Sequence, residues 1–132
     1  HAFVFPTMGE GWGLTMHEAA ATGLPVIYTD WSAPHDWFPR KYGYPVKHGM
    51  MRLTVTKPNE FGQLEHYHDT EGANPDIADI AKKMARIYRN YDEALHKGKL
   101  ASEYVRKITW DTSAARLVEV LREFLGQQEA AA

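Results

Sequence analysis

The fold is decided by residues 2–30, AFVFPTMGEGWGLTMHEAAATGLPVIYTD. Two continuous apolar runs, at residues 2–6 and 25–30, are typical of buried strands. Residues 14–22, which lie between them, favour a helix because alanines stand at their centre. A strand, a helix and a second strand in so short a segment indicate a βαβ unit, in which the strands are parallel and the crossover is right-handed. We therefore predict an α/β fold.

Proline and glycine mark the ends of these elements. Pro6 closes the first strand, Gly23 occupies the C′ position after the helix, and Pro25 prevents the helix from continuing. Ligands of open α/β sheets bind at the carboxyl ends of the parallel strands. Those ends lead into residues 7–13 and 30–38, so we expect the two loops to be neighbours at one edge and to form the site.

The composition excludes several classes of protein. The chain has 132 residues, 44% of them hydrophobic and 24% charged, which fits one globular domain with a sizeable core. A formal net charge of −2 without a cluster of Lys and Arg predicts no nucleic-acid partner. No apolar run reaches the length of a membrane span, and the absence of cysteine excludes disulfides and thiolate metal sites. We expect a cytoplasmic protein, with peripheral binding at the inner face of the membrane as an alternative for the full-length form.

The two ends of the sequence differ from those of a typical gene product. The chain opens on strand residues, with neither an initiator Met nor a signal peptide, so we expect a piece of a longer protein. Its last residues, QQEAAA at 127–132, are typical of a frayed helix end.

The middle of the chain is its least regular part. Residues 51–56 alternate apolar and polar side chains and residues 63–68 follow a turn-like segment, which predicts a β-hairpin at the domain edge. Helical structure is expected to resume after NPD at residues 74–76, where Asn74 or Asp76 can cap and Pro75 suits the first turn.

The last part of the chain predicts three helices with inward apolar faces, the third capped by Asp111. The faces comprise Ile77, Ile80, Met84, Ile87, Tyr88 and Tyr91 in the first helix, Ala94, Gly98, Ala101, Val105 and Ile108 in the second, and Leu117, Val118, Leu121, Phe124 and Leu125 in the third.

The first loop combines glycines with two acidic residues. Gly9, Gly11 and Gly13 let backbone amides approach a ligand, and they lie beside a helix N-terminus that favours an anion such as a diphosphate. Glu10 and Glu18 would repel a phosphate, so we expect them to accept hydrogen bonds from sugar hydroxyls. The loop therefore predicts a nucleotide-sugar clamp.

A structural alternative accounts for the same residues. Thr15 and Glu18 match a capping box, in which Glu18 closes its own helix. Glu10 is then a solvated turn residue, and the glycines form a tight turn.

The wider sequence resembles the donor-binding segment of retaining glycosyltransferases of family 4, which have the GT-B fold. Residues 3–38, FVFPTMGEGWGLTMHEAAATGLPVIYTDWSAPHDWF, contain the strand ending in Pro, the Glu-Gly-Trp-Gly, the second Glu and the Ala-x-Ala-x-Gly-x-Pro-Val segment of that family. Residues 75–124 are similar to its C-terminal helices, including the Thr-Trp before the last one. The resemblance implies that residues 1–132 are the C-terminal portion of a Rossmann-like GT-B domain.

That resemblance also implies roles for the loop. Glu10 contacts the donor sugar and is the candidate catalytic residue, Glu18 accepts from the ribose hydroxyls, and the glycosyl group is transferred with retention as the nucleoside diphosphate leaves. Neither a cofactor nor a metal is implied. The implied donor-binding residues are Gly9, Glu10, Gly11, Trp12, Gly13, Leu14 and Glu18.

Two departures from the family pattern stand out. The first Rossmann half, with its phosphate-binding Arg and Lys, and the acceptor domain lie upstream of this sequence. We therefore expect the 132-residue chain alone to transfer no sugar, and its open sheet edge to favour self-association. Gly72 stands where many relatives carry Trp shortly before Pro-Asp, which leaves the packing of the hairpin open.

Residues of the second loop have two interpretations. Asp30, His35 and Asp36 either approach the donor or hold the shape of the loop. Trp31, Trp37 and Phe38 favour packing, although the aromatic segment 37–44 is also consistent with a partner surface.

Other histidines suggest metal chemistry only weakly. His66 and His68 would share one strand face without an evident third ligand, and His17 with Glu18 does not complete a zinc-protease motif because Ala21 holds the last position.

Two alternatives to a transferase remain. A non-catalytic module could use the same surface to bind a nucleotide or a partner, and a GT-B isomerase such as a sugar-nucleotide epimerase is a weaker rival. In the transferase interpretation the partners are a nucleotide-sugar donor, an unidentified glycosyl acceptor and the missing N-terminal domain.

Overall fold

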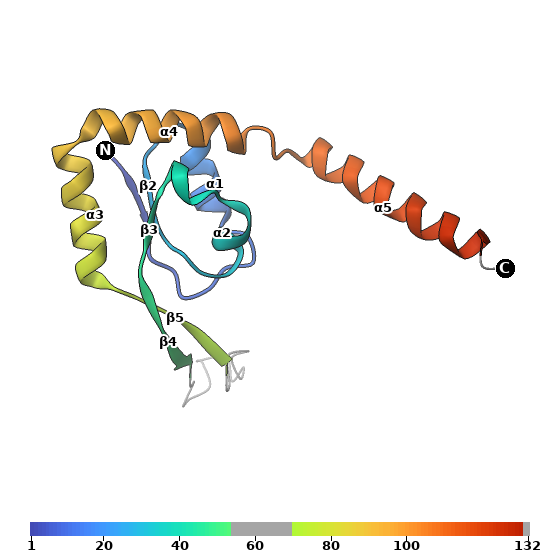
Figure 1. Cartoon of the computed structure of the whole chain (residues 1–132), viewed down its shortest axis with the longest axis horizontal. Coiled ribbons are helices and arrows are strands. Elements are labelled where there is room, and N and C mark those ends of the chain that lie inside the picture. The colour runs from blue at the N-terminus through green and yellow to red at the C-terminus, as the bar shows by residue number, and fades with distance from the viewer. Residues whose placement is uncertain (54–69, 131–132) are drawn as a thin grey trace, which may run out of the picture.

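The computed structural model describes residues 1–53 and 70–130, with side chains as far as residue 126 (Figure 1). The elements in chain order are β1 (Phe3–Phe5), α1 (Leu14–Ala21), β2 (Val26–Thr29), α2 (Ser32–Trp37), the 3-10 helix η1 (Arg40–Tyr42), β3 (Tyr44–Val46), β4 (His48–Leu53), β5 (Thr70–Pro75), α3 (Ile77–Arg89), α4 (Tyr91–Val105) and α5 (Trp110–Ala130).

The centre of the fold is a parallel sheet in the order β1-β2-β3. Phe3 of β1 is level with Val26 of β2, and Ile27 of β2 is level with Tyr44 of β3. The predicted βαβ unit, with β1 and β2 parallel and joined by α1, is confirmed. β3 was not predicted, because Tyr44–Val46 is too short to stand out from the irregular sequence around it.

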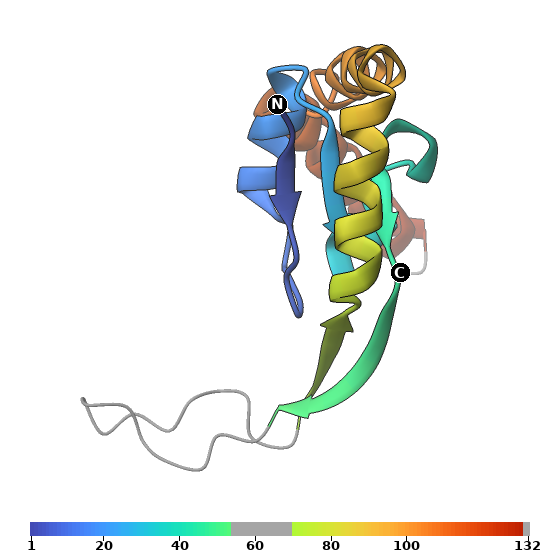
Figure 2. The same cartoon turned by 90° about the vertical axis from the view of Figure 1, so that its left-hand side faces the viewer.

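Helices cover both faces of this sheet (Figure 2). Val26 and Tyr28 of β2 point to the face where α1 and α4 pack, and they join Met16 and Ala101 in one core cluster. Ile27 points to the opposite face, where it joins a second cluster with residues of β3, α3 and α4. All four residues of β2 are buried, as expected for a strand covered on both faces.

The predicted face of α4 is confirmed for four of its five residues, whereas Ile108 lies beyond the end of the helix at Val105. Ala94, Gly98, Ala101 and Val105 are all buried. A Cβ at Gly98 would lie 2.1 Å from the carbonyl oxygen of Gly23, so glycine is required for α4 to approach the turn that ends α1.

The prediction for α5 is wrong in two respects. Its apolar side chains do not face inward, because Leu117, Leu121 and Phe124 are 59%, 50% and 56% exposed. The helix extends away from the sheet instead (Figure 1). Its start is capped by Thr109, whose Oγ1 accepts the Thr112 N–H at 3.1 Å, rather than by Asp111.

The predicted apolar face of α3 is wider than the part that packs. Ile87 is buried and Ile80 packs against the same cluster, but Ile77 and Tyr88 are 80% and 87% exposed. Asp76 caps α3 by accepting the Asp79 N–H, whereas Pro75 ends β5 and does not begin the helix.

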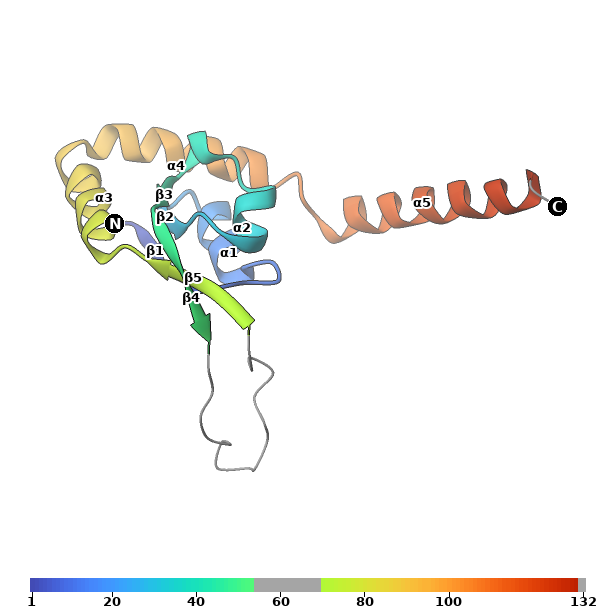
Figure 3. The same cartoon turned by 60° about the horizontal axis from the view of Figure 1, so that its bottom comes forward.

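An antiparallel hairpin is present, and its first strand, β4, contains residues 51–53 of the predicted first strand. β4 pairs antiparallel with β5, with His48 level with Pro75 and Leu53 level with Thr70. The predicted second strand, residues 63–68, lies outside the described residues, as do His66 and His68. Figure 3 shows β4 and β5 extending from the end of the sheet.

The hypothesis that residues 37–44 form a partner surface is wrong. Phe38 and Tyr44 are buried in the two core clusters, and a Cβ at Gly43 would lie 2.8 Å from the Phe38 ring. Its aromatic side chains pack toward the core where the chain passes from α2 to β3, while Arg40 and Lys41 between them are exposed. None of the helices that the structure describes is long and apolar enough to cross a membrane.

Candidate functional site

Gly13 joins the first loop to α1 and is fixed by both its backbone and its surroundings. It is the N-cap residue of α1, with φ +82°, a conformation that favours glycine. A Cβ there would lie 3.2 Å from the Phe5 ring and 3.5 Å from Pro34. Gly13 is therefore a structural requirement of the fold.

Gly9 and Gly11 have no such requirement. Neither has a positive φ, and a Cβ at either position would meet no atom within 4 Å. The described residues therefore leave the space beside this part of the loop open. Glycine at both positions leaves the loop backbone accessible to a ligand, which the fold alone does not demand.

No side chain among the described residues caps the N-terminus of α1. The first amides of a helix have no intrahelical acceptor, and they give this end of the helix a partial positive charge. The capping-box alternative is wrong, because Thr15 is already the second helical residue and Gly13 is the N-cap. Glu18 therefore does not close its own helix.

Glu10 and Glu18 have free carboxylates. Glu10 is half-buried and Glu18 is exposed. Within residues 1–53 and 70–126, neither carboxylate accepts a hydrogen bond or forms an ion pair. Both are thus available to hydroxyl donors from a ligand.

The two predicted loops meet, as expected from the parallel sheet. The Glu10 N–H donates to Ser32 Oγ at 2.9 Å, and the Ala33 N–H donates to the Glu10 carbonyl at 3.4 Å. The Trp37 indole N–H donates to the Trp12 carbonyl at 2.8 Å. Sequence reasoning missed Ser32, since a serine in a polar loop carries no distinguishing signal.

An aromatic cluster continues this contact. The Trp12 and Trp37 rings stack with centroids 5.1 Å apart and planes 7° apart, and His17 lies 5.3 Å from Trp37. The Trp12 indole N–H donates to His17 Nδ1 at 3.3 Å. The packing predicted for Trp37 and Phe38 is confirmed, while Trp31 stays 37% exposed with its ring against His48.

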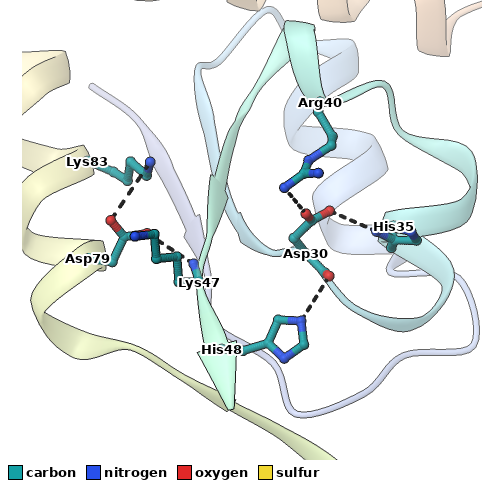
Figure 4. A network of polar contacts seen from close by, with 7 residues as sticks. All are labelled: Asp30, His35, Arg40, Lys47, His48, Asp79 and Lys83. Atoms are coloured by element: carbon teal, nitrogen blue, oxygen red, sulfur yellow. Dashed lines mark hydrogen bonds and ion pairs between the residues drawn. The ribbon is translucent and has the colours of Figure 1, made fainter. Parts of the chain in front are cut away.

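Asp30, at the end of β2, is the centre of a polar network (Figure 4). One carboxylate oxygen lies 3.0 Å from His35 Nδ1 and the other 2.6 Å from an Arg40 nitrogen. Its carbonyl lies 3.1 Å from His48 Nε2. Because these groups occupy both carboxylate oxygens, the geometry favours the loop-shaping role for Asp30 and His35, while Asp36 is exposed on α2.

A second network joins α3 to the start of the hairpin (Figure 4). The buried Asp79 accepts the Lys47 N–H at 3.0 Å, and Lys83 lies 3.8 Å from its other oxygen. Sequence reasoning missed this role. The sequence feature that could have predicted it is the position of Asp79, three residues after the cap Asp76, where a helix N-terminus favours negative charge.

The hairpin also supports the first loop (Figure 3). The Ala73 N–H of β5 donates to the Met8 carbonyl at 2.8 Å. A Cβ at Gly72 would lie 3.2 Å from the same carbonyl and 3.0 Å from Leu53. Gly72 thus allows β5 to approach the loop, and this contact resolves the packing that its departure from the family pattern left open.

Other features of the described residues do not add to this site. They contain no group of three metal-ligating side chains. Two hollows of about 480 and 510 Å³ lie along α3 rather than at the loops. Burial raises the pKa of Tyr28 in the core, and the Asp30 charge adds to this shift, so its phenol stays neutral near neutral pH.

A sequence model described as family 4 glycosyltransferase in conflict systems matches residues 1–117. The match includes both loops, the sheet and the start of α5. Comparison with the curated proteins gives no significant match. Because the matched residues make up most of its length, the chain belongs to the family 4 glycosyltransferases of conflict systems.

Proposed function

We propose that this chain supplies the donor side of a retaining glycosyl transfer from a nucleotide-diphosphate sugar, within a GT-B enzyme. The observation that carries the proposal is the pair of free carboxylates, Glu10 and Glu18, on either side of an uncapped helix N-terminus. Membership of the family supports the reaction class.

The diphosphate is assigned to the start of α1. The amides of Gly11 to Leu14 and the positive end of the helix dipole offset its charge. The open space at Gly9 and Gly11 supports close approach of the backbone to phosphate oxygens. In this proposal no metal is required.

The two carboxylates recognise hydroxyl groups at opposite ends of the donor. Glu18 accepts from the ribose and Glu10 from the sugar that is transferred. The bond between the anomeric carbon and the diphosphate oxygen breaks, the acceptor oxygen bonds to that carbon with the same configuration, and the acceptor proton leaves with the diphosphate. Groups that favour the developing charge lower the barrier.

A non-catalytic nucleotide-binding module would use the same diphosphate and ribose contacts. It differs in Glu10, which would then have no sugar to recognise. Binding of the nucleotide and of the nucleotide sugar therefore separates the two functions.

The test is calorimetric titration of the GT-B enzyme that contains this chain with UDP, GDP and ADP and with the corresponding nucleotide sugars. Glu18→Gln is expected to weaken the nucleotide and the nucleotide sugar alike by about 10-fold or more, because a hydrogen bond to a charged group contributes about 1.5–3 kcal/mol. Glu10→Gln should weaken only the nucleotide sugar.

Glu103→Gln, at an exposed position of α4, is the matched control and should leave binding unchanged. If Glu18→Gln binds the nucleotide as tightly as the wild type, Glu18 does not contact the ribose. Equal losses for nucleotide and nucleotide sugar in Glu10→Gln would contradict the assignment of Glu10 to the sugar.

A further inference from the structure

Ser32 holds an unusual backbone conformation beside the candidate site. Its φ of +54° makes it the one non-glycine residue with a positive φ in the described part of the chain. The left-handed region disfavours side chains with a Cβ, so this conformation persists only where the surroundings determine it.

The surroundings of Ser32 include the backbone of Glu10. Ser32 Oγ accepts the Glu10 N–H at 2.9 Å, and the next residue, Ala33, donates its N–H to the Glu10 carbonyl at 3.4 Å. These contacts hold the peptide groups on both sides of the Glu10 Cα. The direction of its Cα–Cβ bond, from which the carboxylate side chain extends, follows from these contacts.

The support for Ser32 is itself anchored to the body of the fold. Pro34 of α2 is fully buried, and the Tyr104 hydroxyl of α4 donates to the Trp37 carbonyl at 2.9 Å. The loop is held on its other side as well, because Met8 accepts the Ala73 N–H. Glu10 therefore lies on a short segment that is held at both ends.

We propose that Ser32 is a positioning residue, which sets the orientation of Glu10 for contact with the donor sugar through the hydrogen bond from the Glu10 amide to its hydroxyl. The role of the Glu10 carboxylate in this statement rests on the proposed function. The hydrogen bond and the strained backbone are properties of the chain alone, so the positioning itself can be tested without a ligand.

Ser32→Gly is the informative variant, because glycine accepts the positive φ while the CH2OH group, and with it the acceptor of the Glu10 N–H, is removed. Ser102→Ala is the matched control, since Ser102 also uses its hydroxyl for a backbone hydrogen bond, to the Ala21 carbonyl at 2.8 Å, away from the loop. Both variants lose one hydroxyl contact, so a general loss of stability affects them alike.

The first measurement is amide hydrogen exchange of Glu10 in the unliganded chain. Ser32→Gly is expected to speed this exchange about 2- to 10-fold relative to the wild type, the range that loss of one ordinary hydrogen bond produces, whereas Ser102→Ala leaves it unchanged. Equal Glu10 exchange in Ser32→Gly and the wild type would overturn the positioning role.

The second measurement compares affinity for UDP-glucose with affinity for UDP, and likewise GDP-mannose with GDP and ADP-glucose with ADP. Ser32→Gly is expected to weaken the nucleotide sugar about 2- to 10-fold more than the nucleotide, because only the sugar contact depends on Glu10. A purely structural serine would weaken both equally, which would also overturn the proposal.

The two proposals fail separately. If the GT-B enzyme that contains this chain binds none of these probes, the proposed function is contradicted, while Glu10 exchange still decides whether Ser32 holds the loop.

Discussion

α4 and α5 are consecutive helices with predicted apolar faces, and only α4 packs against the sheet. The face of α4 consists of small residues, and Gly98 brings its backbone against the turn at Gly23. The face of α5 consists of large residues such as Leu117 and Phe124, which stay more than half exposed. The two helices differ in whether a complementary surface lies within reach.

This difference shows what the apolar pattern of a helix sequence can and cannot predict. Hydrophobic periodicity identifies the face of a helix that is unfavourable in water. It does not state that the same chain covers that face. Small residues carry more information, because only a close approach by a neighbour makes them necessary, as at Gly98.

The largest expected effect is that of Gly98→Ala. A Cβ at this position would lie 2.1 Å from a backbone oxygen that no side-chain rotation can move, so α4 must shift. We expect the free energy of unfolding to fall by about 3 kcal/mol, at the upper end of typical overpacking. Urea unfolding followed by circular dichroism measures it.

Gly126→Ala is the matched change on α5, where a Cβ meets no atom within 4 Å. It should leave the unfolding of the body unchanged and raise helicity slightly, since alanine favours a helix by about 1 kcal/mol over glycine. A comparable loss of stability in both variants would show that α5 packs as tightly as α4.

A smaller effect is expected from truncation of valine on the two helices. Val105 of α4 is fully buried, so Val105→Ala should lower the free energy of unfolding by about 2 kcal/mol through lost burial and an internal cavity. Val118 of α5 is 44% exposed, and Val118→Ala should change the free energy of unfolding by less than about 0.5 kcal/mol. Thermal unfolding of both variants measures this difference. A larger loss of stability in Val118→Ala than in Val105→Ala would contradict the view that only α4 packs.

The smallest effect concerns a buried hydroxyl within the packed body. Among the described residues the buried Tyr28 hydroxyl has no hydrogen-bond partner, so Tyr28→Phe should stabilise the chain by about 1 kcal/mol. Tyr88→Phe, at a position 87% exposed, is the control and should have no effect.

The same residue makes stability depend on pH. Burial raises the pKa of Tyr28 above its ordinary value near 10, so the unfolded chain releases this proton first. The free energy of unfolding is therefore unaffected by this ionisation below about pH 10, and it falls as the pH rises further. Urea unfolding at increasing alkaline pH should show a shallower decline in Tyr28→Phe, and an identical decline would contradict this assignment.

Local patterns were sufficient to predict the core of the fold and the place of the candidate site. Apolar runs at residues 2–6 and 25–30, with Gly23 and Pro25 between the helix and the second strand, predicted a parallel βαβ unit. Its topology placed both loops at one edge, where Glu10 contacts Ser32. These features are decided by neighbours in the sequence and by the geometry of parallel strands.

Only the tertiary structure decided which partner each surface meets. The pairing of β4 with residues 70–75, the contacts of Asp30 with Arg40 and His48, and the outward position of α5 all join or separate distant segments. A residue's type shows that it can donate, accept or be buried. Whether a partner stands opposite depends on the positions of all the other elements, because packing and hydrogen bonding require contact at a few ångströms.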